Sequence, residues 1–405
     1  MENKMLRAED VMGGNRDAIN SLRDFICPLF FRNSSGELIV KSDRALMIHG
    51  PPGTGKRTLV SAIVQEFDAH LTVISPHSLY GAQAGESEKA VCDAFLEAES
   101  NSKSRPSVVF IDEIDALCPC RGSRSERDNR MTSLVMALMD YSSLSSSPFV
   151  VIAATNRIEA VDPALRRSGR FGTEVEVGIP SESDRLQILT LYTKSKQLAS
   201  DVNLRAIASS CNGYVGADLE ALCCEAMKSA LQGRTNRADL VLSMKDWEHA
   251  KSVVHSSITR GITVGIPEVT WRDIGGLEEL KKKLKQAVEW PIKHPEAFAR
   301  FGITPNKGIM LYGPPGCSKT TLVKAAANAA NASFFSLTGA SLYSMYVGEG
   351  EALLRRTFRS ARMASPSIIF FDEIDSVAAK RESESGVNDG LLTTLLVEMD
   401  GLEQG

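Results

Sequence analysis

Short apolar runs alternate with longer segments of mixed polarity through the first part of the chain. The apolar runs carry no charged residue and are rich in β-branched side chains, which predicts strands that are buried on both faces. These runs are residues 45–49, 71–75, 107–111 and 149–154. Segments with apolar residues at helical spacing separate them, at residues 57–67, 87–99 and 131–139. Strands that alternate with helices predict an α/β fold in which a parallel sheet is flanked by helices.

The strand pattern stops after residue 176, and amphipathic helical segments follow at residues 181–195, 203–210, 217–232 and 244–255. They predict a small all-α domain. Two glycines and a proline within residues 259–267 then indicate a linker. The predicted parts are a first α/β domain at 1–178, a helical lid domain at 179–258, a linker at 259–270 and a second α/β domain at 271–405.

The second α/β domain repeats the first. A Gly-Gly segment, a glycine-rich loop and a carboxylate-ended strand each occur twice, about 260 residues apart. The pairs are 10–14 with 271–276, 50–57 with 313–320, and 107–113 with 367–373. A shared offset for three motifs indicates a duplicated module. The sequence stops shortly after the counterpart of the helix at 133–140, so we expect the second copy to be incomplete and unable to form a full ring by itself.

Composition and charge narrow the class of protein. The chain has 405 residues, 43% hydrophobic and 24% charged, which is typical of a globular protein of two or three domains. Its net charge of −4 provides no general attraction to nucleic acid or to an anionic membrane. The basic run Lys281–Lys285 lies in a helical pattern, which favours a solvated helix face over a nucleic-acid contact.

Cysteine usage and hydropathy bear on location. The eight cysteines form no C-x-x-C pair, which favours reduced thiols over zinc or disulfide roles. The N-terminus has no apolar core, and no apolar run reaches membrane-spanning length. We therefore expect a cytoplasmic or nuclear protein, without membrane insertion.

The glycine-rich loop Gly50-Pro-Pro-Gly-Thr-Gly-Lys-Arg57 lies between a predicted strand and a predicted helix. Glycines there allow backbone N–H groups to surround a polyphosphate, and the helix N-terminus and lysine add positive charge. This layout predicts a phosphate-binding loop and, with the alternating strands and helices, a fold of the P-loop NTPase type. The alternative, a structural turn, does not account for the carboxylate-ended strand that follows each copy. We expect Lys56 and Lys319 to contact the β- and γ-phosphates.

Polar groups follow the buried strands. Asp112 and Asp372 are expected to hold Mg²⁺, and the adjacent Glu113 and Glu373 to polarise the attacking water. Asn156 ends the next strand, where it could orient this water and read the γ-phosphate, or simply cap the strand.

Three arginines, Arg166, Arg167 and Arg170, precede the helical domain. A surface charge cluster is one interpretation. Permanently charged, planar donors also stabilise phosphoryl transfer, often in a neighbouring subunit. Because these arginines lie far along the chain from their own loop, we expect action in trans, which implies a ring.

Each loop departs from the usual pattern in one place. Arg57 occupies the position where a Ser or Thr hydroxyl normally ligates Mg²⁺, and Thr58 is about 100° further around the helix. Ser318 replaces the second loop glycine, whereas Thr320 is present as a metal ligand. We therefore expect a first site that binds ATP but hydrolyses it slowly, and a second site with intact phosphate-loop chemistry.

The motifs GPPGTGK, FIDEID, ATN, LRRSGRF and GYVGADLEAL, followed by WRDIGGLEELKKKL, GPPGCSKT and FFDEID, resemble the type II, tandem-module AAA ATPases, the class of valosin-containing protein. The resemblance covers nearly the whole chain. GPPGCSKT and residues 112–124 are similar to the spermatogenesis-associated protein 5-like branch, which is linked to ribosome biogenesis. It implies an ATP- and Mg²⁺-dependent hydrolase in a hexameric ring that unfolds or extracts polypeptide clients, such as components of pre-ribosomal particles.

The resemblance also assigns roles. It makes Arg167 and Arg170 trans-acting arginine fingers, Asn156 the first sensor and Tyr346 the aromatic residue that grips a polypeptide in the pore. Residues 82–84, the counterpart in the first module, contain no aromatic residue. The residues expected to bind nucleotide are Gly50, Pro51, Pro52, Gly53, Thr54, Gly55, Lys56, Arg57, Thr58, Gly216, Ala217, Asp273, Ile274, Gly275, Gly313, Pro314, Pro315, Gly316, Cys317, Ser318, Lys319, Thr320 and Thr321.

A different class of function remains open. The chain could be a weakly hydrolysing, nucleotide-binding scaffold subunit in a mixed ring with a related AAA ATPase, which Arg57 and the absent first-module aromatic favour. A nucleic-acid motor has only the short basic run in its support. The family usually carries a recognition domain before its first module, so we expect Met1 not to mark the complete N-terminus.

Overall fold

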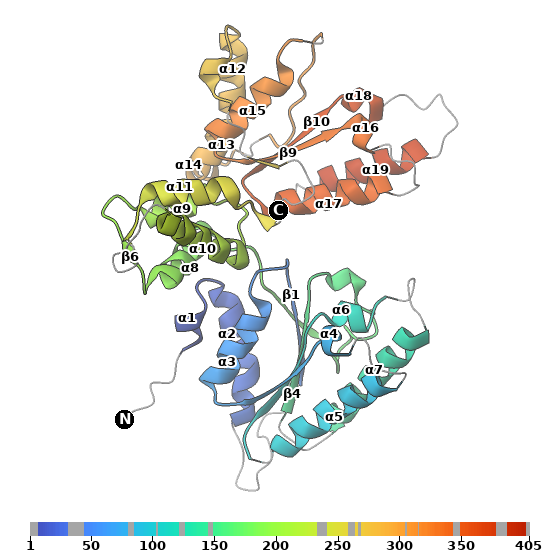
Figure 1. The fold of residues 1–405 in the computed structure, drawn as a ribbon. Coiled ribbons are helices and arrows are strands. Elements are labelled where there is room, and N and C mark those ends of the chain that lie inside the picture. Colours follow the sequence, from blue (N-terminus) through green and yellow to red (C-terminus); the bar gives the residue numbers. More distant parts are fainter. Residues whose placement is uncertain are drawn as a thin grey trace. The chain divides into compact units, whose positions relative to one another are not determined.

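The computed structural model describes most of the chain (Figure 1). The described residues are 7–30, 44–79, 85–102, 104–120, 126–144, 149–232, 241–257, 264–265, 269–303, 306–314, 316–342, 349–377 and 387–401. They divide into two compact units, residues 1–208 with 215–254 and residues 209–214 with 255–405. Among the described helices, none has the length and apolar character needed to cross a lipid bilayer.

The first unit contains the predicted parallel sheet. Its strands are β1 (Ala45–His49), β2 (His70–Ile74), β3 (Ser107–Ile111), β4 (Phe149–Thr155) and β5 (Thr173–Glu176). They lie in the order β2-β3-β4-β1-β5, and every neighbouring pair is parallel. This order places β1 between β4 and β5, and β4 beside β3. The carboxyl ends of β1, β3 and β4 therefore meet at one edge of the sheet.

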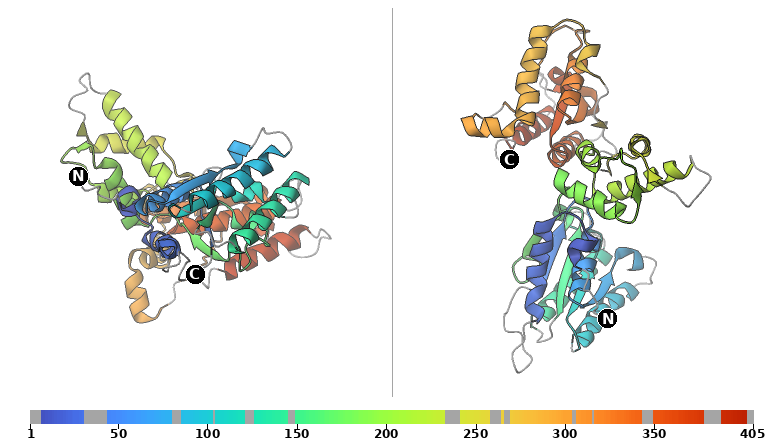
Figure 2. Two further views of the ribbon diagram at one scale, coloured as in Figure 1. Left: turned by 90° about the horizontal axis from the view of Figure 1, so that it is seen from below. Right: turned by 90° about the vertical axis from the view of Figure 1, so that its left-hand side faces the viewer.

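Helices cover both faces of this sheet (Figure 1; Figure 2). On one face, Leu46 and Ile48 of β1 pack with α2 (Arg16–Ile26) and α3 (Lys56–Glu66). On the other, Ala45 and Met47 pack with α5 (Glu86–Asn101) and α7 (Glu126–Leu144). Alternate residues of β1 are thus buried on opposite faces, which explains its continuous apolar run. The short helices α1 (Ala8–Val11), α4 (Pro76–Leu79) and α6 (Ile114–Leu117) complete these layers.

The helical part of the first unit contains α8 (Glu182–Thr193), α9 (Leu204–Ser210), α10 (Gly216–Gln232) and α11 (Met244–Val253). Trp247 of α11 is 2% exposed and is among its largest buried side chains. Two-residue strands, β6 (Gln197–Leu198) and β7 (Val241–Leu242), also pair in parallel here. The predicted helical domain is confirmed, and this short pairing is an addition to it that two-residue segments are too short to predict from an alternating pattern.

The second unit contains β9 (Ser333–Thr338) and β10 (Ser367–Asp372), which pair in parallel as the counterparts of β2 and β3. Within the predicted linker, β8 (Val264–Gly265) pairs antiparallel with β9. The helices are α12 (Glu278–Leu284), η7 (Lys285–Glu289, a π-helix), α13 (Trp290–Lys293), α14 (Pro295–Phe301), α15 (Lys319–Ala329), α16 (Gly339–Leu342), α17 (Glu349–Met363), α18 (Ile374–Val377) and α19 (Val387–Asp400), with a 3₁₀ turn, η6 (Trp271–Asp273).

The counterpart of β1, residues 308–312, forms no strand. Ile309, Met310 and Tyr312 are 45%, 77% and 93% exposed. In the first unit β1 gains its backbone partners from β4 and β5. Within the part of the second unit that the structure describes, the sheet consists of β8, β9 and β10 alone, so this apolar segment has no neighbouring strand on which to pair.

Candidate nucleotide-binding sites

The first phosphate loop, residues 50–55, connects β1 to α3 in an arrangement that requires glycine. Gly53 and Gly55 have φ values of +80° and +89°, which side chains other than glycine rarely adopt. A Cβ at Gly53 would also lie 2.9 Å from the Val215 side chain and 3.1 Å from the Ala217 Cβ. The Ala217 N–H donates to the Gly53 carbonyl at 3.0 Å. The predicted neighbours of the loop, Gly216 and Ala217, therefore belong to a segment that packs directly on it.

Lys56 is the centre of this site. Its side chain is 9% exposed, and its Nζ donates to the Gly50 and Pro51 carbonyls at 2.8 Å each and to Asn156 Oδ1 at 2.6 Å. Burial lowers the Lys56 pKa to about 8, against the opposing effect of nearby carboxylates, Asp112 first among them. The structure thus brings the loop lysine and the predicted sensor asparagine into direct contact.

The predicted carboxylates lie at the end of β3. The Asp112 N–H donates to the Ile74 carbonyl at 2.8 Å, and the Glu113 N–H donates to Asp112 Oδ1 at 3.1 Å. Glu113 has a left-handed φ of +48° at the start of α6, and Glu373 repeats this conformation with +54°. A left-handed φ is uncommon for residues other than glycine and occurs most often at functional sites, so its recurrence at both glutamates is compatible with the role predicted for them.

Asp115 is a member of the site that we did not single out from the sequence. It accepts a hydrogen bond from Thr155 Oγ1 at 2.9 Å and lies 3.5 Å from the Arg157 guanidinium. Thr155 and Arg157 flank Asn156, so Asp115 holds both neighbours of the predicted sensor. The recurrence of the same motif at Asp375 was the available signal.

The three arginines have different surroundings. Arg170 forms a bidentate pair with Asp140, at 2.9 and 2.8 Å, and donates to the Ala164 carbonyl at 3.0 Å. This hydrogen-bonded pairing lowers the Asp140 pKa and raises the Arg170 pKa. Arg166 pairs with Glu174 at 2.7 Å. The Arg167 side chain is exposed and has no hydrogen-bond or ion-pair partner among the described residues, which leaves the guanidinium available to another molecule.

Residues 12–14 form a second part of the first site that was not assigned to it from the sequence. Gly55 lies close to Met12, whose Cε would be 3.3 Å from a Cβ at that glycine. A Cβ on Gly13 would lie 2.7 Å from the Ile188 backbone nitrogen, and Gly14 has a φ of +76° against Asp184 of α8. Residues 12–14 therefore fill the space between α8 and the loop, in the positions that match Ile274, Gly275 and Gly276 of the second copy. The repeat of the Gly-Gly segment was the signal for it.

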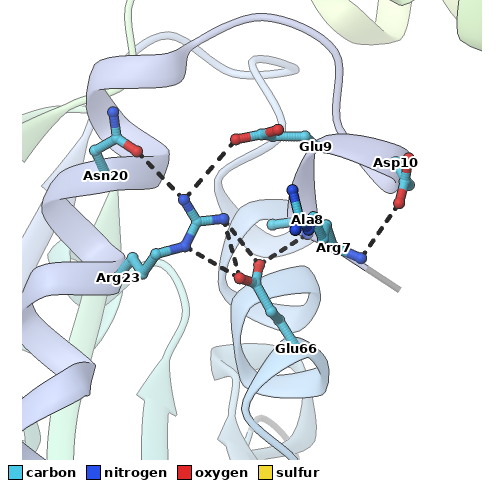
Figure 3. Close-up of polar contacts among 7 residues, drawn as sticks. All are labelled: Arg7, Ala8, Glu9, Asp10, Asn20, Arg23 and Glu66. Carbon is cyan, nitrogen blue, oxygen red and sulfur yellow. Dashed lines mark hydrogen bonds and ion pairs between the residues drawn. The ribbon is translucent and has the colours of Figure 1, made fainter. Parts of the chain in front are cut away.

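An ionic cluster fixes this segment to the loop helix (Figure 3). Glu66, at the end of α3, accepts from Arg23 Nε and Nη2 at 3.1 Å each and from the Ala8 N–H at 2.8 Å. Arg23 also donates to Asn20 Oδ1 at 3.3 Å and lies 3.8 Å from Glu9. The hydrogen bonds to Glu66 raise the Arg23 pKa. One carboxylate thus connects α1, α2 and α3, and residues 12–14 lie between the first two.

The second phosphate loop has the same internal geometry but is more exposed. Lys319 Nζ donates to the Gly313 and Pro314 carbonyls at 2.9 and 3.0 Å. Ser318, in the position of Gly55, keeps a left-handed φ of +56°, which costs about 1 kcal/mol for a residue with a side chain. Pro315 and Tyr346 lie outside the described residues, as do residues 82–84.

Within the described parts of the two loops, only the second has the pair of oxygen ligands that Mg²⁺ prefers. Thr320 Oγ1 donates to Asp372 Oδ2 at 3.3 Å, so the predicted hydroxyl and carboxylate lie together. In the first copy, the Thr54 hydroxyl donates to the Pro51 carbonyl at 2.9 Å. Arg57 and Thr58 are both exposed. The residues present fit Mg²⁺ at the second site and do not fit it at the first.

The adenine-side segment of the second copy is held by hydrogen bonds. Asp273 accepts from the Thr270 N–H at 2.7 Å and from its hydroxyl at 2.8 Å, which lowers the Asp273 pKa. Ile274 is buried, and its carbonyl accepts from Lys281 Nζ at 2.7 Å. Lys285 lies 5.4 Å from the centre of the Trp271 ring. The interpretation of Lys281–Lys285 as one solvated face was therefore wrong, because two of its lysines have partners within the second unit.

Comparison with known families agrees with this geometry. The pattern of the family described as "ATPase family associated with various cellular activities (AAA)" matches residues 46–179 and again residues 309–405. The pattern of the "AAA+ lid domain" matches residues 201–249. The chain belongs to the AAA family of ATPases, with an α/β P-loop module, a lid and a second, partial α/β module.

Three relatives are similar over nearly all of the chain. Cell division control protein 48 homolog B of Arabidopsis thaliana is 60% identical over 99% of this chain, which covers 68% of that relative. The human ATPase family gene 2 protein homolog A is 42% identical over 100% of the chain, which covers 47% of it. The cell division cycle protein 48 homolog of Archaeoglobus fulgidus is 42% identical over 98% of the chain, which covers 56% of it.

These relatives confirm the type II, tandem-module class of valosin-containing protein and, through the human relative, the resemblance to the spermatogenesis-associated ATPases. The chain spans between 47% and 68% of the length of these three proteins.

Proposed function

We propose that this chain provides the nucleotide-driven part of a protein-remodelling ATPase, which works as a hexameric ring and unfolds or extracts polypeptide clients. The observation that carries the proposal is Lys56, held by two loop carbonyls and by Asn156 beside two half-buried carboxylates. Family membership makes ATP the expected nucleotide. Work on clients requires this site to be coupled to neighbouring subunits.

The residues divide the chemistry as follows. A triphosphate replaces the loop carbonyls as the partner of Lys56, while backbone N–H groups of residues 50–55 surround its oxygens. Glu113 accepts a proton from the attacking water, which Asn156 holds in line. The side chain of Arg167, which is exposed and has no partner among the described residues, reaches the γ-phosphate of the next subunit. Arg170 instead supports the arginine segment through Asp140.

The second site uses Lys319 and Glu373 in the same roles. There Thr320 and Asp372 would hold Mg²⁺, which neutralises charge on the transferring phosphoryl group. The first site lacks the hydroxyl ligand, so we propose that it binds ATP and hydrolyses it slowly.

Turnover measurements test the assignment of the two sites. We expect Glu373→Gln to remove most of the ATPase activity of the full chain and Glu113→Gln to remove little, with both proteins still binding ATP. Arg57→Thr should raise first-site turnover, measured in the Glu373→Gln background. Equal and rapid first-site turnover with and without the Arg57→Thr substitution would contradict slow hydrolysis.

A second function, a weakly hydrolysing scaffold subunit of a mixed ring, is favoured by Arg57. Size-exclusion chromatography with light scattering in the presence of ATP separates the two. A homohexamer with turnover supports the motor. Assembly only after addition of a related AAA ATPase, with little turnover of this chain's own, supports the scaffold.

The client remains a proposal from the resemblance. We propose that Tyr346 grips an extended polypeptide and that the clients include components of pre-ribosomal particles, in the cytoplasm or nucleus. Tyr346→Ala should leave basal ATPase activity in place and abolish client unfolding. Co-sedimentation of the chain with pre-ribosomal particles in a gradient tests the second part, and an absence of the chain from those fractions in ATP would contradict it.

A further inference from the structure

Arg57 is the second residue of α3, directly after Lys56, as Thr320 follows Lys319 in α15. In the second copy, the Thr320 hydroxyl bonds to Asp372. In the first copy, the Arg57 side chain is exposed and has no hydrogen-bond or ion-pair partner among the described residues. The guanidinium is therefore free to turn toward the loop, at the helix position from which Thr320 reaches its carboxylate.

The charges at the first loop favour an anion without its metal. Lys56 and Arg57 place two cations on adjacent residues at the N-terminus of α3, where the helix dipole adds further positive potential. A divalent cation between Arg57 and the phosphates would be repelled by the guanidinium at short range. The first site also offers no threonine hydroxyl next to Asp112 as a second metal ligand, because the Thr54 hydroxyl donates to the Pro51 carbonyl and Thr58 is exposed.

A guanidinium can do the binding work of the metal. It is planar and permanently charged, and it donates two parallel hydrogen bonds to neighbouring phosphate oxygens. It belongs to the second residue of α3, next to Lys56, at the helix end where the β- and γ-phosphates are expected to bind. It does not supply the fixed octahedral oxygen shell through which Mg²⁺ orders a phosphoryl transfer.

We propose that the first site takes its nucleotide as the metal-free anion, with the Arg57 guanidinium on the β- and γ-phosphates in place of Mg²⁺, whereas the second site requires Mg²⁺. This inference rests on the proposed nucleotide-binding function of the first loop. The two sites would then bind different ligands: the first site binds free ATP, and the second site binds the complex of ATP with magnesium.

Calorimetric titration with ATP tests the proposal on the full chain carrying Lys319→Ala, which isolates the first site. The titration is run once in excess Mg²⁺ and once in excess EDTA. We expect the two affinities to agree within about threefold. A loss of tenfold or more in EDTA would overturn the proposal. Absence of ATP binding both in Mg²⁺ and in EDTA would reject the proposed nucleotide-binding function of the loop. Binding in Mg²⁺ alone would reject only the metal-free binding proposed here.

Matched substitutions keep the test specific. In the same background, Arg57→Thr should bind ATP well in Mg²⁺ and at least about tenfold more weakly in EDTA. The reciprocal protein, Thr320→Arg with Lys56→Ala, should make the second site resistant to EDTA. Circular dichroism confirms that each variant is folded. If Arg57→Thr still binds ATP equally well in Mg²⁺ and in EDTA, then Lys56 and the helix N-terminus account for the metal-independent binding, and the proposal is wrong.

Discussion

The two copies of the module share a phosphate loop but differ in what surrounds it. In both, the lysine Nζ donates to the first two carbonyls of its own loop, at 2.8 to 3.0 Å. The strand that leads into the first loop, β1, is buried between β4 and β5, whereas its counterpart, residues 308–312, forms no strand and exposes 93% of Tyr312. The loop conformation is therefore a local property of its sequence, while its burial depends on strands that come later in the chain.

The largest difference between the copies should appear in stability. Met47 is fully buried in β1, and Met310, at the same position of the second copy, is 77% exposed. We expect Met47→Ala to lower the free energy of unfolding of the first unit by about 2–5 kcal/mol, because it leaves a cavity. Met310→Ala should change stability by less than about 0.5 kcal/mol. Urea denaturation followed by circular dichroism checks both, and equal effects would show that residues 308–312 are buried in solution.

The ionic cluster around Glu66 is the next test, because the second copy has Ala329 at that position. Glu66→Gln removes the charge that Arg23 and the Ala8 N–H share, and should cost about 1–3 kcal/mol of stability. It should also weaken ATP binding at the first site, since residues 12–14 lose their support. The control is Glu9→Gln. The Glu9 carboxylate lies 3.8 Å from the Arg23 guanidinium and its side chain is 53% exposed, so this substitution should have little effect on stability. Equal losses in both variants would contradict the central role of Glu66.

Proton binding by Lys56 should give the first site its own pH dependence. Below its pKa of about 8 the free site already holds an ammonium, so ATP affinity should be nearly independent of this group. Above it, the amine must take up a proton before it can contact phosphate, so affinity should fall by up to about tenfold per pH unit. Lys56→Arg keeps its charge and should abolish this slope. Titrations from neutral to alkaline pH in the Lys319→Ala background provide the measurement, and an unchanged slope in the arginine variant would assign the dependence to another group.

The smallest expected effect concerns the arginine segment. Asp140 pairs with Arg170, whereas Asp400, its counterpart at the end of α19, is exposed and has no ion-pair partner among the described residues. Asp140→Asn should lower stability by less than about 1 kcal/mol, because the pair is partly exposed. Asp400→Asn should have no measurable effect. A larger effect on turnover than on stability for Asp140→Asn would show that Arg170 is positioned for catalysis by this pair.

The sequence was sufficient to predict those features that depend on contiguous residues. The buried strands, the loop with Lys56 and the pairing of Thr320 with Asp372 follow from apolar runs and from motifs that place charge at strand ends. The sheet order brought Asn156 to Lys56, as parallel strands with adjacent carboxyl ends require.

Features that depend on the approach of distant segments could not be predicted. Nothing in the run of three arginines says that Arg170 meets Asp140 while Arg167 stays exposed. Lys281 is buried because its ammonium group donates to the carbonyl of Ile274, seven residues earlier, which the turn at the start of α12 brings close to it. In each case the chemistry was visible in the sequence, but the choice of partner was set by packing.

The contact between Gly53 and Ala217 has a consequence for the order in which the protein is completed during synthesis. The Gly53 carbonyl receives its hydrogen bond from an N–H in α10, which leaves the ribosome long after the loop itself. Contacts of such high sequence separation form late, because the intervening chain must first be closed into a loop. The first phosphate loop is thus translated well before the α10 segment that completes it, and it is one of the last parts of its domain to reach its final shape.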